Sequence, residues 1–68
     1  MWSMDTAPRD RKLTVVAQQM IVGLGPLDEP PFHAIAQYYP EHGFWAAEDR
    51  ELNGEIRLRP LHTLGWIC

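Results

Sequence analysis

The chain has a single cysteine among 68 residues, Cys68, and this scarcity excludes an internal disulfide. Its three histidines, His33, His42 and His62, lie far apart and lack the short ligand spacing of a structural zinc site. A domain this small buries only about 60% of its unfolded surface and often needs a disulfide, a metal or a partner subunit. We therefore expect one small domain, residues 1–68, that relies on packing or on a second copy of itself.

Long apolar runs and an excess of basic residues are also missing. The longest apolar stretch, Val15–Leu24, is interrupted by Gln18 and Gln19 and falls short of the ~20 residues that span a membrane. The opening Met1–Asp5 lacks the features of a signal peptide. Nine acidic residues against six basic ones give a net charge of −3, which disfavours a general nucleic-acid binder. These features predict a soluble protein of the cytoplasm.

Three tryptophans stand near the start, middle and end of the chain, at Trp2, Trp45 and Trp66. Large aromatic side chains supply much of the core of a small domain. We expect Trp45 and Trp66 to be core residues, whereas Trp2 could either pack inward or form part of a binding surface. The spacing predicts that both ends of the chain fold back onto a central hairpin.

Two hairpins are predicted in the second half of the chain. Residues 32–39 and 44–48 alternate like strands around the turn 40–43. Asn53-Gly54 is the dipeptide favoured in a type I′ turn, and it predicts a second hairpin. After that turn, residues 55–59 alternate with Ile56 and Leu58 on one face and the charged residues on the other. A further strand is predicted after Pro60, over residues 61–67.

The segment 12–22 is ambiguous between two structures. At a period of two, Leu13, Val15 and Ala17 share a face, whereas at helical spacing Leu13, Val16, Ala17 and Met20 do. The β-branched content favours a strand, and a short helix is the alternative. The predicted fold class is therefore mainly β: a small antiparallel sheet of four or five strands built from hairpins, with one short helix if this segment is not a strand.

Residues 2–10, WSMDTAPRD, resemble the opening of a family of very short phage and prophage proteins. The opening of that family reads Trp-x-x-Ile-Glu-Thr-Ala-Pro-Arg/Lys-Asp-Gly, and an apolar strand, a Gly-x-Trp and a closing Thr-x-Trp-x-Pro-Leu follow. The matching elements here are residues 13–16, 43–45 and 62–66. The chain departs from the pattern at Arg11, in one extra residue before Trp66, in its last two residues and in an apparent insertion at 23–31.

The resemblance implies a small antiparallel β domain carried by a mobile element, with no catalytic residue to transfer. Such accessory proteins often bind a host machine. The resemblance therefore implies a non-enzymatic protein of the bacterial cytoplasm that acts by protein–protein contact, with inhibition of a host defence complex, such as a CRISPR effector, as one such role. Neither a cofactor nor a metal is expected.

An acidic cluster surrounds the second predicted hairpin. It predicts a patch that docks on a basic surface of a protein partner. The alternative is a solvated hairpin face neutralised by nearby arginines. Exposed aromatic residues could anchor the same contact. The candidate contact residues are Glu41, Glu48, Asp49, Glu51, Glu55, Trp2, Tyr38 and Tyr39. Alternation sends one of the two tyrosines inward, and the sequence leaves open which one.

Three further alternatives concern the basic residues, the opening motif and the oligomeric state. The first is a nucleic-acid module that uses Arg9, Arg11, Lys12, Arg57 and Arg59. The opening motif 6–10 is either a recognition loop or a capped turn. In a capped turn, we expect Asp5 or Asp10 to accept backbone N–H groups or to pair with Arg9. The last alternative is a structural homodimer.

Overall fold

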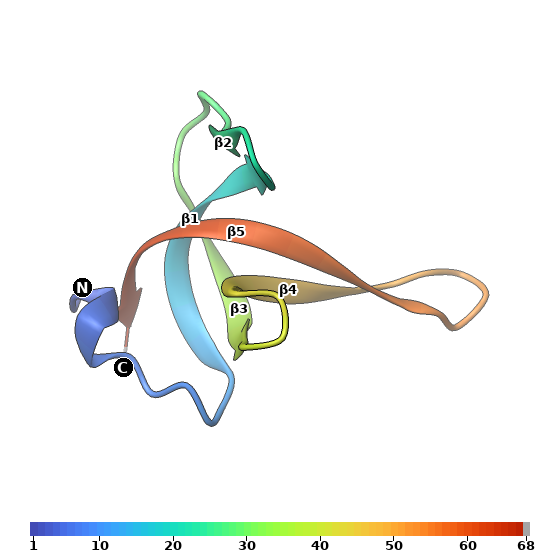
Figure 1. Ribbon diagram of the computed structural model, residues 1–68, viewed down its shortest axis with the longest axis horizontal. Helices are drawn as coiled ribbons and strands as arrows, with labels where there is room; N and C mark the ends of the chain where they lie inside the picture. Colours follow the sequence, from blue (N-terminus) through green and yellow to red (C-terminus); the bar gives the residue numbers. More distant parts are fainter. Residues whose placement is uncertain (68) are drawn as a thin grey trace.

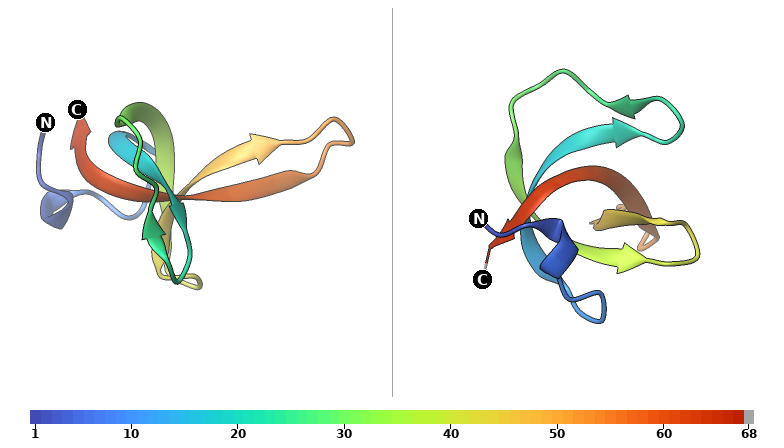
Figure 2. Two further views of the ribbon diagram at one scale, coloured as in Figure 1. Left: turned by 90° about the horizontal axis from the view of Figure 1, so that it is seen from above. Right: turned by 60° about the vertical axis from the view of Figure 1, so that its left-hand side comes forward.

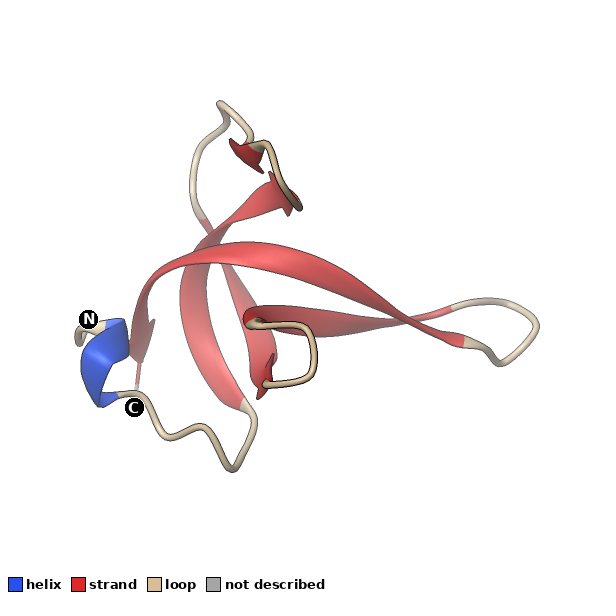
Figure 3. Cartoon of the chain, in the orientation of Figure 1, coloured by secondary structure: helices blue, strands red, loops and turns tan. Residues whose placement is uncertain are grey.

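The computed structural model describes residues 1–67, and its regular secondary structure is almost entirely antiparallel strand. Figure 3 shows the strands with one short 3-10 turn near the N-terminus. The elements are η1 (Met4–Thr6), β1 (Leu13–Ile21), β2 (Gly25–Pro26), β3 (Phe32–Tyr39), β4 (Phe44–Arg50) and β5 (Ile56–Ile67). The prediction of a mainly β fold with four or five strands is confirmed.

The sheet closes on itself. Strands β1, β3, β4 and β5 pair in that order, and β5 then pairs with β1, so that these four strands form a small ring. Val15 of β1 shows the closure directly, because it pairs with Ala34 of β3 on one side and with Trp66 of β5 on the other. The short β2 pairs only with the end of β1 and lies outside the ring, at the top of Figure 1.

The ambiguous segment is a strand, and its inward face follows the period of two. Val15 and Ala17 are completely buried, and Leu13 packs against the core. A strand with neighbours on both sides satisfies its backbone groups in the ladder, and the β-branched Val15 and Val16 fit that pleated surface. The strand ends at Ile21, just before a turn in which Gly23 adopts φ 89°.

The core lies inside the ring. Trp45 and Trp66 are 7% and 8% exposed, and they belong to one cluster with Val15, Leu61 and Ala36. The prediction that these two tryptophans form the core is confirmed. Trp2 is 54% exposed and lies outside that cluster.

The second hairpin exists, but the predicted turn type is wrong. Glu51 donates its N–H to the carbonyl of Glu55 at 2.8 Å, and the Gly54 N–H donates to the carbonyl of Glu51 at 3.0 Å. A type I′ turn needs positive φ at both central residues, whereas only Gly54 has it, at 88°. The Asn53 side chain instead accepts a hydrogen bond from the Glu55 N–H at 3.0 Å, and the loop spans residues 52–54.

Pro60 does not divide the last segment into two strands. β5 runs unbroken from Ile56 to Ile67, pairing with β4 up to Leu61 and with β1 from Leu61 onward. At Pro60 the strand has β4 as its only neighbour. A proline lacks the N–H that a strand with two neighbours would need, so it fits this position.

The leader is tied to β5 through its tryptophan. Trp2 and Trp66 exchange backbone hydrogen bonds of 2.8 and 2.9 Å, and their rings meet edge to face at 4.7 Å. The Trp66 indole N–H also donates to the Ser3 carbonyl at 3.1 Å and to the Thr6 hydroxyl at 3.2 Å. The leader and the end of β5 therefore lie side by side (Figure 1).

The predicted capped turn has different partners from those expected. Ser3 caps η1, because its hydroxyl oxygen accepts a hydrogen bond from the backbone N–H of Asp5. Asp5 therefore takes part through its backbone and not through its carboxylate. Asp10 pairs with Arg11 at 3.1 Å instead of with Arg9. The Arg9 guanidinium lies 4.3 Å from the centre of the Tyr38 ring, where a cation–π contact replaces the expected ion pair.

A β-bulge lies in β5 just before Trp66. Val16 pairs with Gly65 and the next residue, Ala17, pairs with Thr63, so Leu64 has no residue opposite it. A bulge absorbs one additional residue without changing the inward face on either side.

Gly65 is the position where the leader approaches β5 most closely. A Cβ there would lie 2.8 Å from the Trp2 carbonyl oxygen and would overlap the Met1 side chain. We predict that Gly65→Ala lowers the free energy of unfolding by about 1–3 kcal/mol, because backbone has to move. Urea unfolding measures the loss, and near-ultraviolet circular dichroism reports the Trp2–Trp66 contact.

Leu64→Ala is the matched control for this substitution. Leu64 is an exposed neighbour in the bulge, so its truncation should change stability by no more than about 0.5 kcal/mol. A Gly65→Ala protein with wild-type stability and an unchanged aromatic signal would contradict the docked position of the leader.

Candidate protein-contact site

A two-stranded ribbon projects from the ring. Beyond Ala46, β4 no longer pairs with β3, and before Leu61, β5 does not yet pair with β1. We call residues 48–59 the arm; they form the long hairpin at the right of Figure 1 and in the left view of Figure 2. None of these residues is buried. The arm therefore leaves its side chains accessible and adds little to the core.

The two faces of the arm differ in composition. Glu48 pairs with Leu58 and Arg50 with Ile56, so these four side chains share one face, the one that continues Ala46 and borders the pocket. Asp49 pairs with Arg57 and lies on the opposite face. The predicted alternation of Ile56 and Leu58 against the arginines of β5 agrees with this register.

Three acidic residues of the arm are neutralised within the chain. Their ion pairs are Glu48–Lys12 at 3.5 Å, Asp49–Arg59 at 3.4 Å and Glu51–Arg57 at 3.3 Å. Exposed pairs of this kind contribute about 0–1 kcal/mol each. Within residues 1–67, Glu55 and Glu41 form no ion pair. The arm is thus a mixed-charge surface and not a purely acidic patch.

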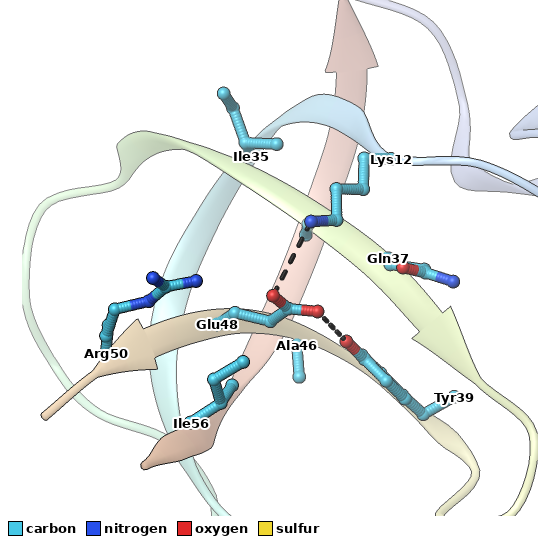
Figure 4. Close-up of a pocket in the computed structure, with 9 residues that line it drawn as sticks. Lys12, Ile35, Gln37, Tyr39, Ala46, Glu48, Arg50 and Ile56 are labelled. Atoms are coloured by element: carbon cyan, nitrogen blue, oxygen red, sulfur yellow. Dashed lines mark hydrogen bonds and ion pairs between the residues drawn. The ribbon is translucent and has the colours of Figure 1, made fainter. Parts of the chain in front are cut away.

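An open pocket of about 250 Å³ lies at the base of the arm, beside Glu48. It exists because β3 and β4 separate after pairing at Gln37 and Ala46. Two isoleucines line it, Ile35 from β3 and Ile56 from β5, and both are more than half exposed, at 65% and 53%. Figure 4 shows Glu48 between these two apolar side chains.

Glu48 is held by two donors. The Tyr39 hydroxyl donates to Glu48 Oε1 at 3.0 Å, and Lys12 Nζ lies 3.5 Å from Oε2 (Figure 4). Partial burial, the hydrogen bond to Glu48, and the negative charges of Glu48 and Glu41 raise the pKa of Tyr39 above its ordinary value of 10.0. Tyr39 and Lys12 therefore each contact one oxygen of the Glu48 carboxylate and together fix its orientation.

The structure brings most of the predicted contact residues to one region and separates two of them. The four acidic residues of the arm lie together, with Tyr39 and Glu41 next to its base. Tyr38 points inward, where its ring meets Trp45 at 5.6 Å. Trp2 lies at the other end of β5, against Trp66. Tyr39 is thus the outward tyrosine of the pair, and neither Trp2 nor Tyr38 adjoins the arm.

Sequence reasoning missed the apolar part of this region. Ile35 has the same parity as Gln37 and Tyr39 and lies on the outward face of β3, but the alternation of the sequence left open which of the two parities faces outward. The position of Ile56 across the pocket could not be inferred, because it depends on the divergence of β3 from β4. The ion pair between Lys12 and Glu48 joins residues 36 positions apart, so the sequence shows Lys12 only as a basic residue.

The basic residues of the nucleic-acid alternative are each engaged inside the chain. Three of them contact acidic residues of the arm. Arg11 contacts its sequence neighbour Asp10, and this hydrogen bond is the main cause that lowers the pKa of Asp10. The contacts are Arg9 on the Tyr38 ring, Arg11 with Asp10, Lys12 with Glu48, Arg57 with Glu51 and Arg59 with Asp49. No continuous row of free cations results from this arrangement in the described residues.

Among residues 1–67, no three histidine, cysteine or acidic side chains gather in a way that could hold a metal ion. No helix in that part of the chain is long and apolar enough to cross a membrane. Cys68 lies outside the described residues.

Comparison of the chain with protein-family models, curated proteins and solved structures gives no match. The resemblance to short phage and prophage proteins therefore remains a prediction from the motifs. The geometry of the arm and pocket carries the functional argument.

The contact between Tyr39 and Glu48 generates a test by titration. A raised pKa in the folded state stabilises the fold below pH 10, and that contribution is lost as the pH rises through the folded value. We predict that Glu48→Gln lowers the pKa of Tyr39 toward its ordinary value. Tyrosinate absorbance against pH measures this change, and Tyr39→Phe identifies which step belongs to Tyr39. An unchanged titration in Glu48→Gln would contradict the hydrogen bond.

Proposed function

We propose that the protein is not an enzyme and acts by binding another protein through the arm. The observation that carries this proposal is the ribbon of residues 48–59, which projects from the ring and buries none of its own side chains. Ordering such a ribbon costs conformational entropy, and the arm buries no side chain in the core that would offset this cost. Binding of another protein to the arm would account for this ordered, exposed surface.

The chemistry of the arm suits a protein partner. Leu52 at its tip is fully exposed, and Ile56 is more than half exposed, beside charged residues of both signs. Interfaces combine apolar anchors of this kind with a polar rim. Glu55, which has no ion pair in the described chain, supplies the free negative charge for a basic partner surface.

The resemblance supplies the proposed setting. Short phage and prophage proteins imply an accessory role in the bacterial cytoplasm, with a host complex as the partner. A defence complex, including a CRISPR effector, is the partner class that this setting favours. Nucleic acid is the less favoured ligand, because the candidate cations Arg57 and Arg59 are already paired with carboxylates of the arm.

Affinity capture from host lysate with paired charge reversals tests the proposal. Glu51→Lys with Glu55→Lys reverses one paired and one unpaired acid at the tip of the arm. We predict that this variant loses the proteins that the wild-type chain retains, as identified by mass spectrometry. Circular dichroism confirms that the fold survives.

The control reverses the same kinds of charge elsewhere. Asp10→Lys with Asp28→Lys changes one acid paired with an arginine and one acid without an ion pair in the described chain. This control should retain the wild-type partners. Equal capture by both variants would mean that the arm is not the contact surface. Retention on DNA that falls steeply with salt would instead favour the nucleic-acid alternative.

A further inference from the structure

The outer edge of β4 is an unpaired strand edge. β3 pairs with β4 only at Phe44, Trp45 and Ala46, so in the described structure the backbone of residues 47–50 has β5 as its only neighbour. Such an edge presents N–H and C=O groups that can pair with another strand. The pocket opens along the same edge, since Ala46, Glu48 and Arg50 are among its lining residues.

We propose that a second copy of this chain occupies this edge, through antiparallel β4–β4 pairing about a two-fold axis at Asp49. The arms of the two copies would then form one four-stranded sheet. A two-fold interface uses the same patch on both copies, so the patch has to complement itself. The inference does not rest on the proposed function, because it concerns the purified chain alone.

The charges of β4 complement one another in this register. With the axis at Asp49, Glu48 lies opposite Arg50 of the second copy, and Arg50 lies opposite Glu48 of the second copy. Arg50 forms no ion pair with its own chain in the described residues, so it is free for this contact. The two Asp49 side chains face each other, but each already contacts Arg59 of its own chain at 3.4 Å.

Neighbouring registers lack this complementarity. An axis at Glu48 would place the two Glu48 side chains opposite each other, and an axis at Arg50 would do the same for the two arginines. Like charges directly opposite in a sheet destabilise the pairing. Among these three positions, Asp49 is therefore the axis that brings opposite charges together twice.

The same register also brings an apolar side chain to the pocket. Because β3 pairs with Ala46, the ladder between the copies ends at Ala47, and Leu52 of the second copy lies just beyond it, beside the pocket that Ala46 lines. Leu52 is fully exposed in the single chain, in the turn just past the end of β4. Ile35 and Ile56 provide apolar walls, and a volume of about 250 Å³ has room for a leucine side chain.

The other free edge of the arm is unsuitable for the same pairing. Pro60 of β5 has no N–H to donate, which blunts that edge. A two-fold axis at Leu58 would also place Arg57 opposite Arg59 of the second copy, so that like charges meet. The β4 edge is consequently the one that pairing with a second copy favours.

A charge-swap experiment by sedimentation equilibrium tests the dimer. We predict that the wild-type chain dimerises at concentrations on the order of 100 µM, as expected for a small interface. Arg50→Glu and Glu48→Arg should each weaken dimerisation by about tenfold or more, because each alone opposes like charges twice. An equimolar mixture of the two variants should recover the wild-type affinity. Positions 48 and 50 are both glutamate in Arg50→Glu and both arginine in Glu48→Arg, so in the mixed dimer each glutamate faces an arginine.

A second pair of variants avoids the charged positions. Leu52→Asp should abolish dimerisation, whereas Leu24→Asp, which changes another highly exposed leucine outside the arm, should leave it unchanged. Circular dichroism checks that each variant is folded. A wild-type chain that stays monomeric up to about 1 mM would overturn the proposal. So would a dimer that survives Leu52→Asp, or charge variants whose mixture does not recover.

Discussion

The pairing of β5 with two different neighbours is the constraint on which the rest of the structure depends. From Leu61 to Ile67 the strand pairs with β1 and closes the ring, which buries Val15 and Trp66. From Ile56 to Leu61 it pairs with β4, and this part runs beyond the ring as the arm. One strand of 12 residues therefore both encloses the core and supports the candidate contact surface. In a domain this small, losing the β1–β5 ladder would open the core and release the arm together.

The residues that carry the resemblance and the residues of the arm have different tasks. Trp2, Thr6 and Trp66 hold the leader against the end of β5, where the Trp66 indole N–H finds oxygen acceptors at the edge of the core. The motif thus has a structural explanation that needs no ligand. The arm lies at the other end of β5 (Figure 1) and is not part of that motif. The opening motif therefore contributes to the fold, whereas the proposed contact surface lies in the arm.

Local patterns predicted most of the strands, and non-local pairings account for what was missed. The alternation around Val15 and the turn at Gly43 depend only on near neighbours in sequence. Closure of the ring joins segments about 50 residues apart, and no local pattern encodes it. The pocket between Ile35 and Ile56 depends on where β3 leaves β4, so it too was invisible in the sequence. Asn53-Gly54 correctly indicated a hairpin, but the side chain of Asn53 found a backbone donor and a different turn resulted.

Amide hydrogen exchange in dilute solution tests most directly whether β5 closes the ring and leaves the arm outside it. Amides that open only with the core exchange slowly, whereas those in an exposed ribbon exchange through local opening. The account predicts the slowest exchange in β1 and in the Leu61–Trp66 part of β5, and much faster exchange over residues 48–59. Rapid exchange along β1 and the end of β5, or an arm as strongly protected as the ring in the monomer, would contradict it.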